Sequence, residues 1–192
     1  MTAEVLSPPR LSRLDVPERA SLPADVEALW ADAERTYGYV PNWLSTLSAN
    51  PATIKRLLDF YKTLWDPRQG GLTIQEREII AVVVSHENGC GYCVANHRVG
   101  LAKALGDKER AHRLADDHHL VDLSPREQAL VDLAVKLTRT PTALTDADLD
   151  GLRGHGLDDA QILEVIEVAA FFNYTNRLTT AIATRPDDQF FA

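Results

Sequence analysis

The sequence has little positive charge for its length. Its 192 residues include 20 lysine and arginine residues against 28 aspartate and glutamate residues, so the formal net charge is -8 at pH 7. Proteins that bind nucleic acid usually carry a basic surface, because lysine and arginine displace the counterions that surround the phosphates. The composition therefore argues against nucleic acid as a partner.

A long hydrophobic run is also missing near the beginning of the chain. Residues 1–22 combine acids, prolines and arginines without the apolar stretch that a signal peptide or a membrane anchor needs. They show little periodicity, so we expect an irregular N-terminal arm that lies across the surface. From these absences we predict a cytoplasmic protein that does not bind a membrane.

Cysteine is scarce, and its two occurrences, Cys90 and Cys93, stand three positions apart. In a reducing cytoplasm such a pair is more often catalytic or metal-binding than a permanent disulfide. A four-ligand zinc site would need a second pair of this kind, which is absent, and covalent haem attachment would need histidine where Val94 stands. We therefore predict a redox-active dithiol with no metal and no cofactor. The alternatives are a zinc site completed by His97 and a distant carboxylate, or a structural disulfide.

What the sequence does contain is helical periodicity, and no strand pattern is visible. Its length and its 45% hydrophobic content fit one all-α domain, which we place at residues 23–192. Proline, glycine and capping residues divide this domain into segments. We expect helices over 23–37, around 44–47, over 51–65, 91–105 and 108–116, and further helices that begin at 73, 124, 145 and 158.

The helix that begins at Thr73 is apolar on every side from Ile79 to Val84, which predicts that it is buried. A small domain can cover such a helix by using one of its sides as a subunit interface. We therefore predict a homo-oligomer.

The dithiol is expected at the beginning of the helix that follows. Cys90 stands at the helix start, Cys93 lies one turn in, and His97 follows four residues after Cys93, so all three share one face. Unpaired N–H groups at a helix N-terminus favour the thiolate, which is the reactive form. An imidazole beside it can carry the thiol proton, so this group has the chemistry of a thiol enzyme.

Together with a glutamate at position 78, these residues form the pattern E-x11-C-x2-C-x3-H. This pattern resembles the alkylhydroperoxidase D-like family of the carboxymuconolactone decarboxylase superfamily. Further similarity to its peroxidase-related branch lies in Val40-Pro41-Asn42, Phe172-Asn173 and Asn176-Arg177. The resemblance covers nearly the whole chain, and it implies an all-α helical bundle, a trimer or hexamer, and a cysteine-based peroxidase.

The resemblance also implies a role for each residue. Cys93 would attack the peroxide and become a sulfenic acid, Cys90 would condense with it to a disulfide, and a thiol reductant would reset the pair. Glu78 would act as the base and His97 would relay the proton. Helix-end electrostatics instead favours Cys90 as the more acidic thiol, and Cys93 can still be the nucleophile if it faces Glu78 and His97 while Cys90 faces solvent. Tyr92 departs from the family, whose best-known members have histidine there.

Three other functions fit the same residues. A disulfide oxidoreductase would use the same dithiol on a protein or a small partner, and a decarboxylase would keep the fold with other chemistry. The non-enzymatic alternative is an oligomeric scaffold or a zinc-binding module.

Several polar and aromatic residues are not expected to take part in catalysis. His86 is a weaker candidate for lining the site, and the remaining histidines are expected in solvent: His112, His118, His119 and His155. We expect Asn173, Asn176 and Arg177 either to border the pocket or to satisfy backbone and interface groups. The three tryptophans are interpreted as packing residues: Trp30, Trp43 and Trp65.

Overall fold

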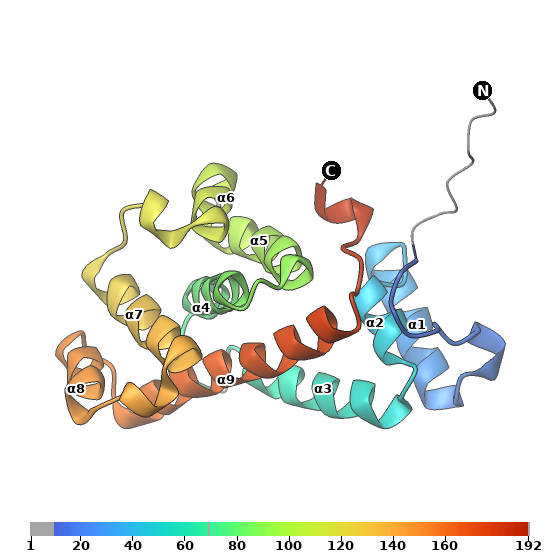
Figure 1. Ribbon diagram of the computed structural model, residues 1–192, viewed down its shortest axis with the longest axis horizontal. Coiled ribbons are helices and arrows are strands. Elements are labelled where there is room, and N and C mark those ends of the chain that lie inside the picture. Colours follow the sequence, from blue (N-terminus) through green and yellow to red (C-terminus); the bar gives the residue numbers. More distant parts are fainter. Residues whose placement is uncertain (1–9, 69, 192) are drawn as a thin grey trace.

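The computed structural model describes residues 10–68 and 70–191, and within these it confirms the all-α prediction (Figure 1). These residues form nine α-helices and four short 3-10 turns, with no strand. The helices are α1 (Ala24–Tyr37), α2 (Asn42–Leu47), α3 (Pro51–Leu64), α4 (Ile74–Glu87), α5 (Gly91–Leu105), α6 (Lys108–Asp116), α7 (Pro125–Arg139), α8 (Asp146–Gly154) and α9 (Asp159–Ala181).

The expected helix starts are confirmed because the capping residues act as the sequence indicated. The Thr73 hydroxyl accepts from the Glu76 N–H while the Glu76 carboxylate accepts from the Thr73 N–H, which forms a capping box at α4. Ser124 caps α7 in the same way, with proline at the first helical position. These local signals fix where the central helices begin.

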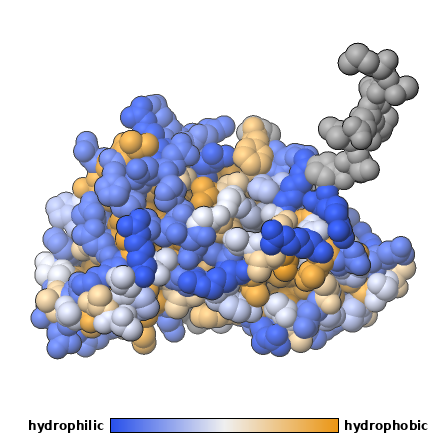
Figure 2. All heavy atoms as spheres, viewed as in Figure 1, coloured by the Kyte–Doolittle hydropathy of each residue, from blue (hydrophilic) through white to orange (hydrophobic). Residues whose placement is uncertain are grey.

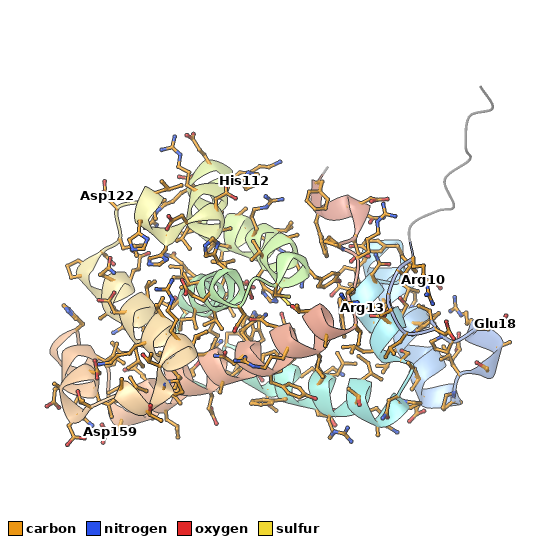
Figure 3. The ribbon with its side chains drawn as sticks, in the orientation of Figure 1. Arg10, Arg13, Glu18, His112, Asp122 and Asp159 are labelled. Carbon is orange, nitrogen blue, oxygen red and sulfur yellow. The ribbon has the colours of Figure 1, made fainter. Side chains whose placement is uncertain are left out.

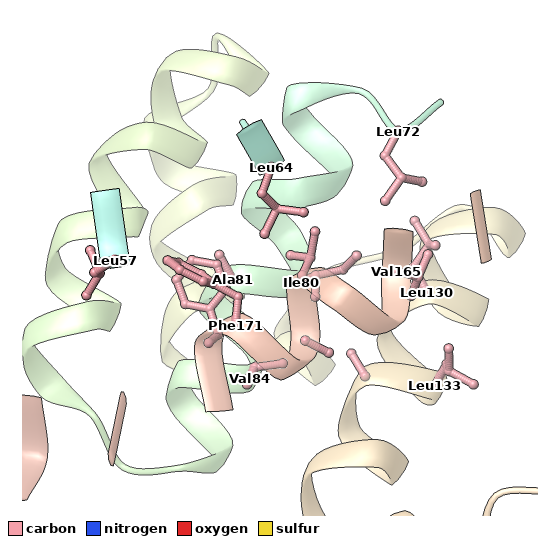
Figure 4. Close-up of a cluster of buried hydrophobic side chains, with 14 of the residues drawn as sticks. Leu57, Leu64, Leu72, Ile80, Ala81, Val84, Leu130, Leu133, Val165 and Phe171 are labelled. Atoms are coloured by element: carbon pink, nitrogen blue, oxygen red, sulfur yellow. The ribbon is translucent and has the colours of Figure 1, made fainter. Parts of the chain in front are cut away.

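Helix α4 is the centre of the molecule. Every residue from Glu76 to Ser85 is buried, and α5, α7, α9 and α6 pack around it (Figure 1). One cluster joins Ile80, Ala81 and Val84 to the apolar faces of α7 and α9 (Figure 4). A single chain covers α4, so its burial does not require the subunit interface from which we predicted an oligomer. The oligomeric state itself stays a prediction.

The described part of the N-terminal segment runs along the end of α9. The Arg13 N–H donates to the Ile182 carbonyl (2.6 Å), and the Arg13 guanidinium donates to the Ala181 carbonyl (Figure 3). The Arg185 N–H in turn donates to the Leu11 carbonyl (2.9 Å). The first nine residues lie outside the described part, so an arm at 1–22 and a domain at 23–192 stay predictions.

The outer surface is mostly hydrophilic in the view of Figure 2, with hydrophobic residues scattered in small groups. Among the described residues, no helix has the length and the apolar character needed to cross a membrane.

One ion pair is buried in the core, between α4 and α9. Arg77 is fully buried, and its Nε–H donates to the Glu164 carboxylate (2.7 Å). The same carboxylate accepts from the Gly71 N–H (2.8 Å) and the Leu72 N–H (3.1 Å). The pair therefore attaches the loop before α4 to α9.

We expect Arg77→Met to lower the free energy of unfolding by about 3 kcal/mol, because it leaves the Glu164 carboxylate buried without its cation. Urea denaturation measures the change. Adding Glu164→Gln should recover part of it, since a neutral amide oxygen can still accept from the loop. Arg68→Met, which removes an exposed arginine from the same loop, is the matched control. Equal stability of Arg77→Met and the control would contradict the assignment.

Candidate active site

The two cysteines lie at the beginning of α5, where Gly89 turns the chain with a φ of 65°. Cys90 is the N-cap residue, and its sulfur accepts from the Cys93 backbone N–H (3.3 Å). Both thiols are free and buried, with 2% of Cys90 and 5% of Cys93 exposed. Cys90 therefore does not face solvent, which was the condition named above for Cys93 as the nucleophile, because packing against Thr179 of α9 covers it.

A hydroxyl from α9 contacts both sulfurs. The Thr179 Oγ1 atom lies 3.0 Å from the Cys90 sulfur and 3.2 Å from the Cys93 sulfur. It also lies 3.0 Å from the Thr175 carbonyl, so its single proton can be donated either to the helix backbone or to a thiolate. Sequence analysis missed Thr179, because 86 residues separate it from Cys93 and no local pattern marks it.

The two thiols differ in acidity. The pKa of Cys90 is lowered to about 6, first by a hydrogen bond from the Cys93 thiol and also by the Thr179 hydroxyl and the Cys93 N–H, which together outweigh burial. The pKa of Cys93 is raised, because its proton is donated to Cys90 and because it is buried. This agrees with the expectation from helix-end electrostatics. These opposite shifts favour a reduced pair that holds one proton, with the negative charge on Cys90.

The predicted acid-base residues meet beside the dithiol. The His97 Nδ1 atom lies 2.8 Å from the Glu78 Oε2 atom, and both side chains are buried. The Glu78 Oε1 atom accepts from the indole N–H of Trp65 (3.3 Å), and the Phe172 ring packs edge-on against the imidazole, with centroids 4.6 Å apart. Trp65 was interpreted as packing alone, but it also orients the carboxylate.

A cavity of about 430 Å³ opens onto Cys93, His97 and Glu78. Cys90 is not among its lining residues, so Cys93 is the thiol that a molecule in the cavity can reach. Its walls are largely aromatic, and the rings come from Tyr37, Tyr39, Trp43, Tyr61, Tyr92, Phe171, Phe172 and Phe190. The arrangement offers a largely apolar binding space with a thiol in its wall.

The asparagines of α9 lie behind the site. Asn88 donates to the side-chain oxygens of both Asn173 (3.1 Å) and Asn176 (3.0 Å), and the Asn176 amide donates to the Ser85 hydroxyl. None of these residues lines the cavity, and Arg177 is exposed. They join the end of α4 to α9 through side-chain hydrogen bonds, and the Asn176 side chain also hydrogen-bonds to Cys93, which acts to lower the pKa of that thiol.

The remaining histidines lie outside the cavity. His86 is exposed and does not line it. The expectation that His118 would be solvated was wrong, since it is 8% exposed, and burial and the neighbouring His119 lower its pKa. Within the described residues, the ligand atoms of Asp117, His118 and His119 lie within 4.8 Å of one another, and this group includes no cysteine.

Comparison with known proteins identifies the family. The model of the carboxymuconolactone decarboxylase family matches residues 51–134. The structure of an alkylhydroperoxidase AhpD core, a peroxidase-related protein from Ralstonia eutropha JMP134, superposes with a TM-score of 0.89 at 33% sequence identity, and the match covers 96% of each chain. This chain belongs to the AhpD-like group of the carboxymuconolactone decarboxylase family.

Two further proteins are similar to this chain. A peroxidase-related protein from Silicibacter sp. TM1040 has a TM-score of 0.89 and 30% identity, over 97% of each chain. The Bacillus subtilis protein YdfG is 24% identical over 135 residues, which are 70% of this chain and 90% of YdfG. The family resemblance drawn from the sequence is thus confirmed, and membership supports an enzyme with a peroxidase-like or decarboxylase-like role.

We expect Thr179→Val to raise the pKa of Cys90 by about one unit, because one hydrogen bond to a charged group contributes about 1.5 kcal/mol. The ultraviolet absorbance of the thiolate, followed against pH, measures this shift. Thr179→Ser keeps the hydroxyl and should titrate like the wild type. Identical titrations of the valine and serine variants would contradict a role of the hydroxyl in thiol acidity.

Proposed function

We propose that the protein is a thiol-dependent peroxidase that reduces hydrogen peroxide or organic hydroperoxides with the dithiol Cys90–Cys93. The observation that carries the proposal is that Cys93 lines the largely apolar cavity together with a hydrogen-bonded carboxylate and imidazole, Glu78 and His97. The relatives named as peroxidase-related support it.

In the proposed cycle, Cys93 is the nucleophile. The proton that Cys93 shares with Cys90 moves onto Cys90, which leaves the negative charge on the sulfur that faces the cavity. The Cys93 thiolate attacks the terminal peroxide oxygen, the O–O bond breaks, and the departing alkoxide takes a proton to leave as an alcohol or as water. Cys93 is then a sulfenic acid.

In the second step of the proposed cycle, the two cysteines form a disulfide. The Cys90 thiol gives its proton to the sulfenic hydroxyl and attacks the Cys93 sulfur, so water leaves and a disulfide forms. Two electrons and two protons from an external dithiol, or from two small thiols, restore the reduced pair. That reductant is the partner the cycle requires.

In this cycle, Glu78 and His97 are assigned to proton transfer. A carboxylate that accepts from Nδ1–H leaves the Nε2 atom of the imidazole as the basic nitrogen. The ring contacts with Phe172 and Trp65 hold this imidazole in one orientation. Once its Nε2 atom has taken up a proton through the cavity, His97 can supply that proton to the departing oxygen, with Glu78 stabilising the imidazolium.

The burial of both sulfurs weighs against the main alternative. A disulfide oxidoreductase that serves a protein partner needs an attacking sulfur within reach of that partner. Here Cys90 and Cys93 are only 2% and 5% exposed, and access runs through the cavity. A decarboxylase-like reaction would leave the thiols unchanged.

Thiol counting and intact mass before and after one equivalent of hydroperoxide test the proposal. We expect the wild type to lose two thiols, and Cys90→Ser to accumulate a trappable sulfenic acid at Cys93. Cys93→Ser should lose peroxidase activity. If both thiols remain free after peroxide treatment, the proposal is contradicted. A disulfide that forms only with a disulfide substrate would favour the oxidoreductase.

We expect Glu78→Gln to lower kcat/KM for hydroperoxide about a hundredfold, the usual contribution of a positioned acid-base group. Gly100→Ala should act in the same direction, because a Cβ atom at position 100 would lie 2.6 Å from the Glu78 Oε1 atom. His155→Ala, at an exposed position, is the control. Peroxidase kinetics measure the effect, and unchanged activity of Glu78→Gln would remove Glu78 from the cycle.

A further inference from the structure

Tyr92, which stands between the two cysteines, joins three parts of the chain. Its side chain is buried, and its hydroxyl donates to the Asp187 carboxylate (2.8 Å) and accepts from the Trp43 backbone N–H (3.3 Å). Burial and the nearby Asp187 carboxylate raise the pKa of Tyr92, so the phenol stays a donor. The first turn of α5 is therefore hydrogen-bonded to α2 and to the residues that follow α9.

Residues 185–191, which we call the closing segment, leave α9 at a sharp turn. Ala183 has a φ of 53°, in the left-handed region, and redirects the chain so that the segment passes between α5 and α2 (Figure 1). Two hydrogen bonds fix it to α2, from the Asn42 N–H to Asp187 (2.8 Å) and from the Asn42 amide to the Arg185 carbonyl (2.9 Å). Together with the bond from Tyr92, they seat Asp187 in a buried position.

The closing segment reaches the cavity through two side chains. Gln189 and Phe190 line it, and the Phe190 ring packs edge-on against Tyr92 with centroids 5.7 Å apart. Phe190 also packs against the cluster that contains Cys90 and Cys93. The adjacent Phe191 is 64% exposed and does not line the cavity.

We propose that the closing segment is a specificity element of the site. Phe190 forms a wall that contacts the organic group of the substrate and shields Cys93, and Tyr92 positions this wall through Asp187. The cavity volume of about 430 Å³ and its aromatic lining fit a hydroperoxide with a compact apolar or aromatic group. The substrate part of this inference rests on the proposed peroxidase function, whereas the shielding part does not.

Two measurements test the proposal on the full chain. The first compares kcat/KM for cumene hydroperoxide with that for hydrogen peroxide, which is too small to depend on the wall. The second compares the rates at which the thiols react with a bulky anionic aromatic disulfide and with iodoacetamide, and it requires no peroxidase activity. Variants are Phe190→Ala and Tyr92→Phe, with Phe191→Ala and the exposed Tyr174→Phe as matched controls.

We expect Phe190→Ala to lower the cumene-to-hydrogen-peroxide ratio about tenfold, since an apolar contact of this size contributes more than 1 kcal/mol to discrimination. The bulky disulfide should react faster relative to iodoacetamide, because the wall is gone. Tyr92→Phe should move both ratios in the same directions, and thermal unfolding should show that all variants are folded.

Unchanged ratios in Phe190→Ala, or equal changes in Phe191→Ala, would overturn the proposal. A change in Phe190→Ala without one in Tyr92→Phe would overturn the positioning role of Tyr92. If no peroxide oxidises the wild-type thiols, the peroxidase function fails. The rate of reaction with the bulky disulfide, relative to that with iodoacetamide, then decides whether the wall shields Cys93.

Discussion

The structure depends on burying α4 on all sides while it carries charged side chains, Arg77 and Glu78 among them, into the core. Arg77 and Glu78 are adjacent, so they point about 100° apart around the helix axis and reach different neighbours. Arg77 pairs with Glu164 on α9, whereas Glu78 bonds to His97 on α5 and to Trp65 at the end of α3. A buried charge without its partner is costly, so these two residues constrain where three other helices can lie.

The same constraint builds the candidate site. Because Glu78 holds His97, the first two turns of α5 are fixed against α4, and Cys93 lies on that part of α5. Helix α9 then closes the other side, where Thr179 lies between the sulfurs. The dithiol thus gains one acidic thiol, Cys90, that is inaccessible, and one accessible thiol, Cys93, that is less acidic. In the proposed cycle, a proton that moves from Cys93 to Cys90 places the thiolate on the accessible sulfur.

The sequence predicted what local chemistry determines. Capping residues mark the starts of α4 and α7, and a motif of four residues brings together the dithiol, Glu78 and His97. It could not predict contacts that depend on packing between distant segments. Thr179 and Asp187 reach the site from 86 and 95 residues away, and Trp65 looked like any buried tryptophan. The burial of His118 was misjudged for the same reason, because exposure is a property of the assembled helices.

The residue at position 92 affects which side chains can transfer protons near the dithiol. A histidine at this position could exchange protons near neutral pH, whereas a buried tyrosine whose pKa is raised cannot. Its single proton is donated to Asp187, and the oxygen also accepts from Trp43, so it has no free proton to offer the dithiol. Proton transfer in the proposed cycle is then confined to Glu78 and His97 on one side of the dithiol. On the other side, Tyr92 and the closing segment shape the wall of the cavity.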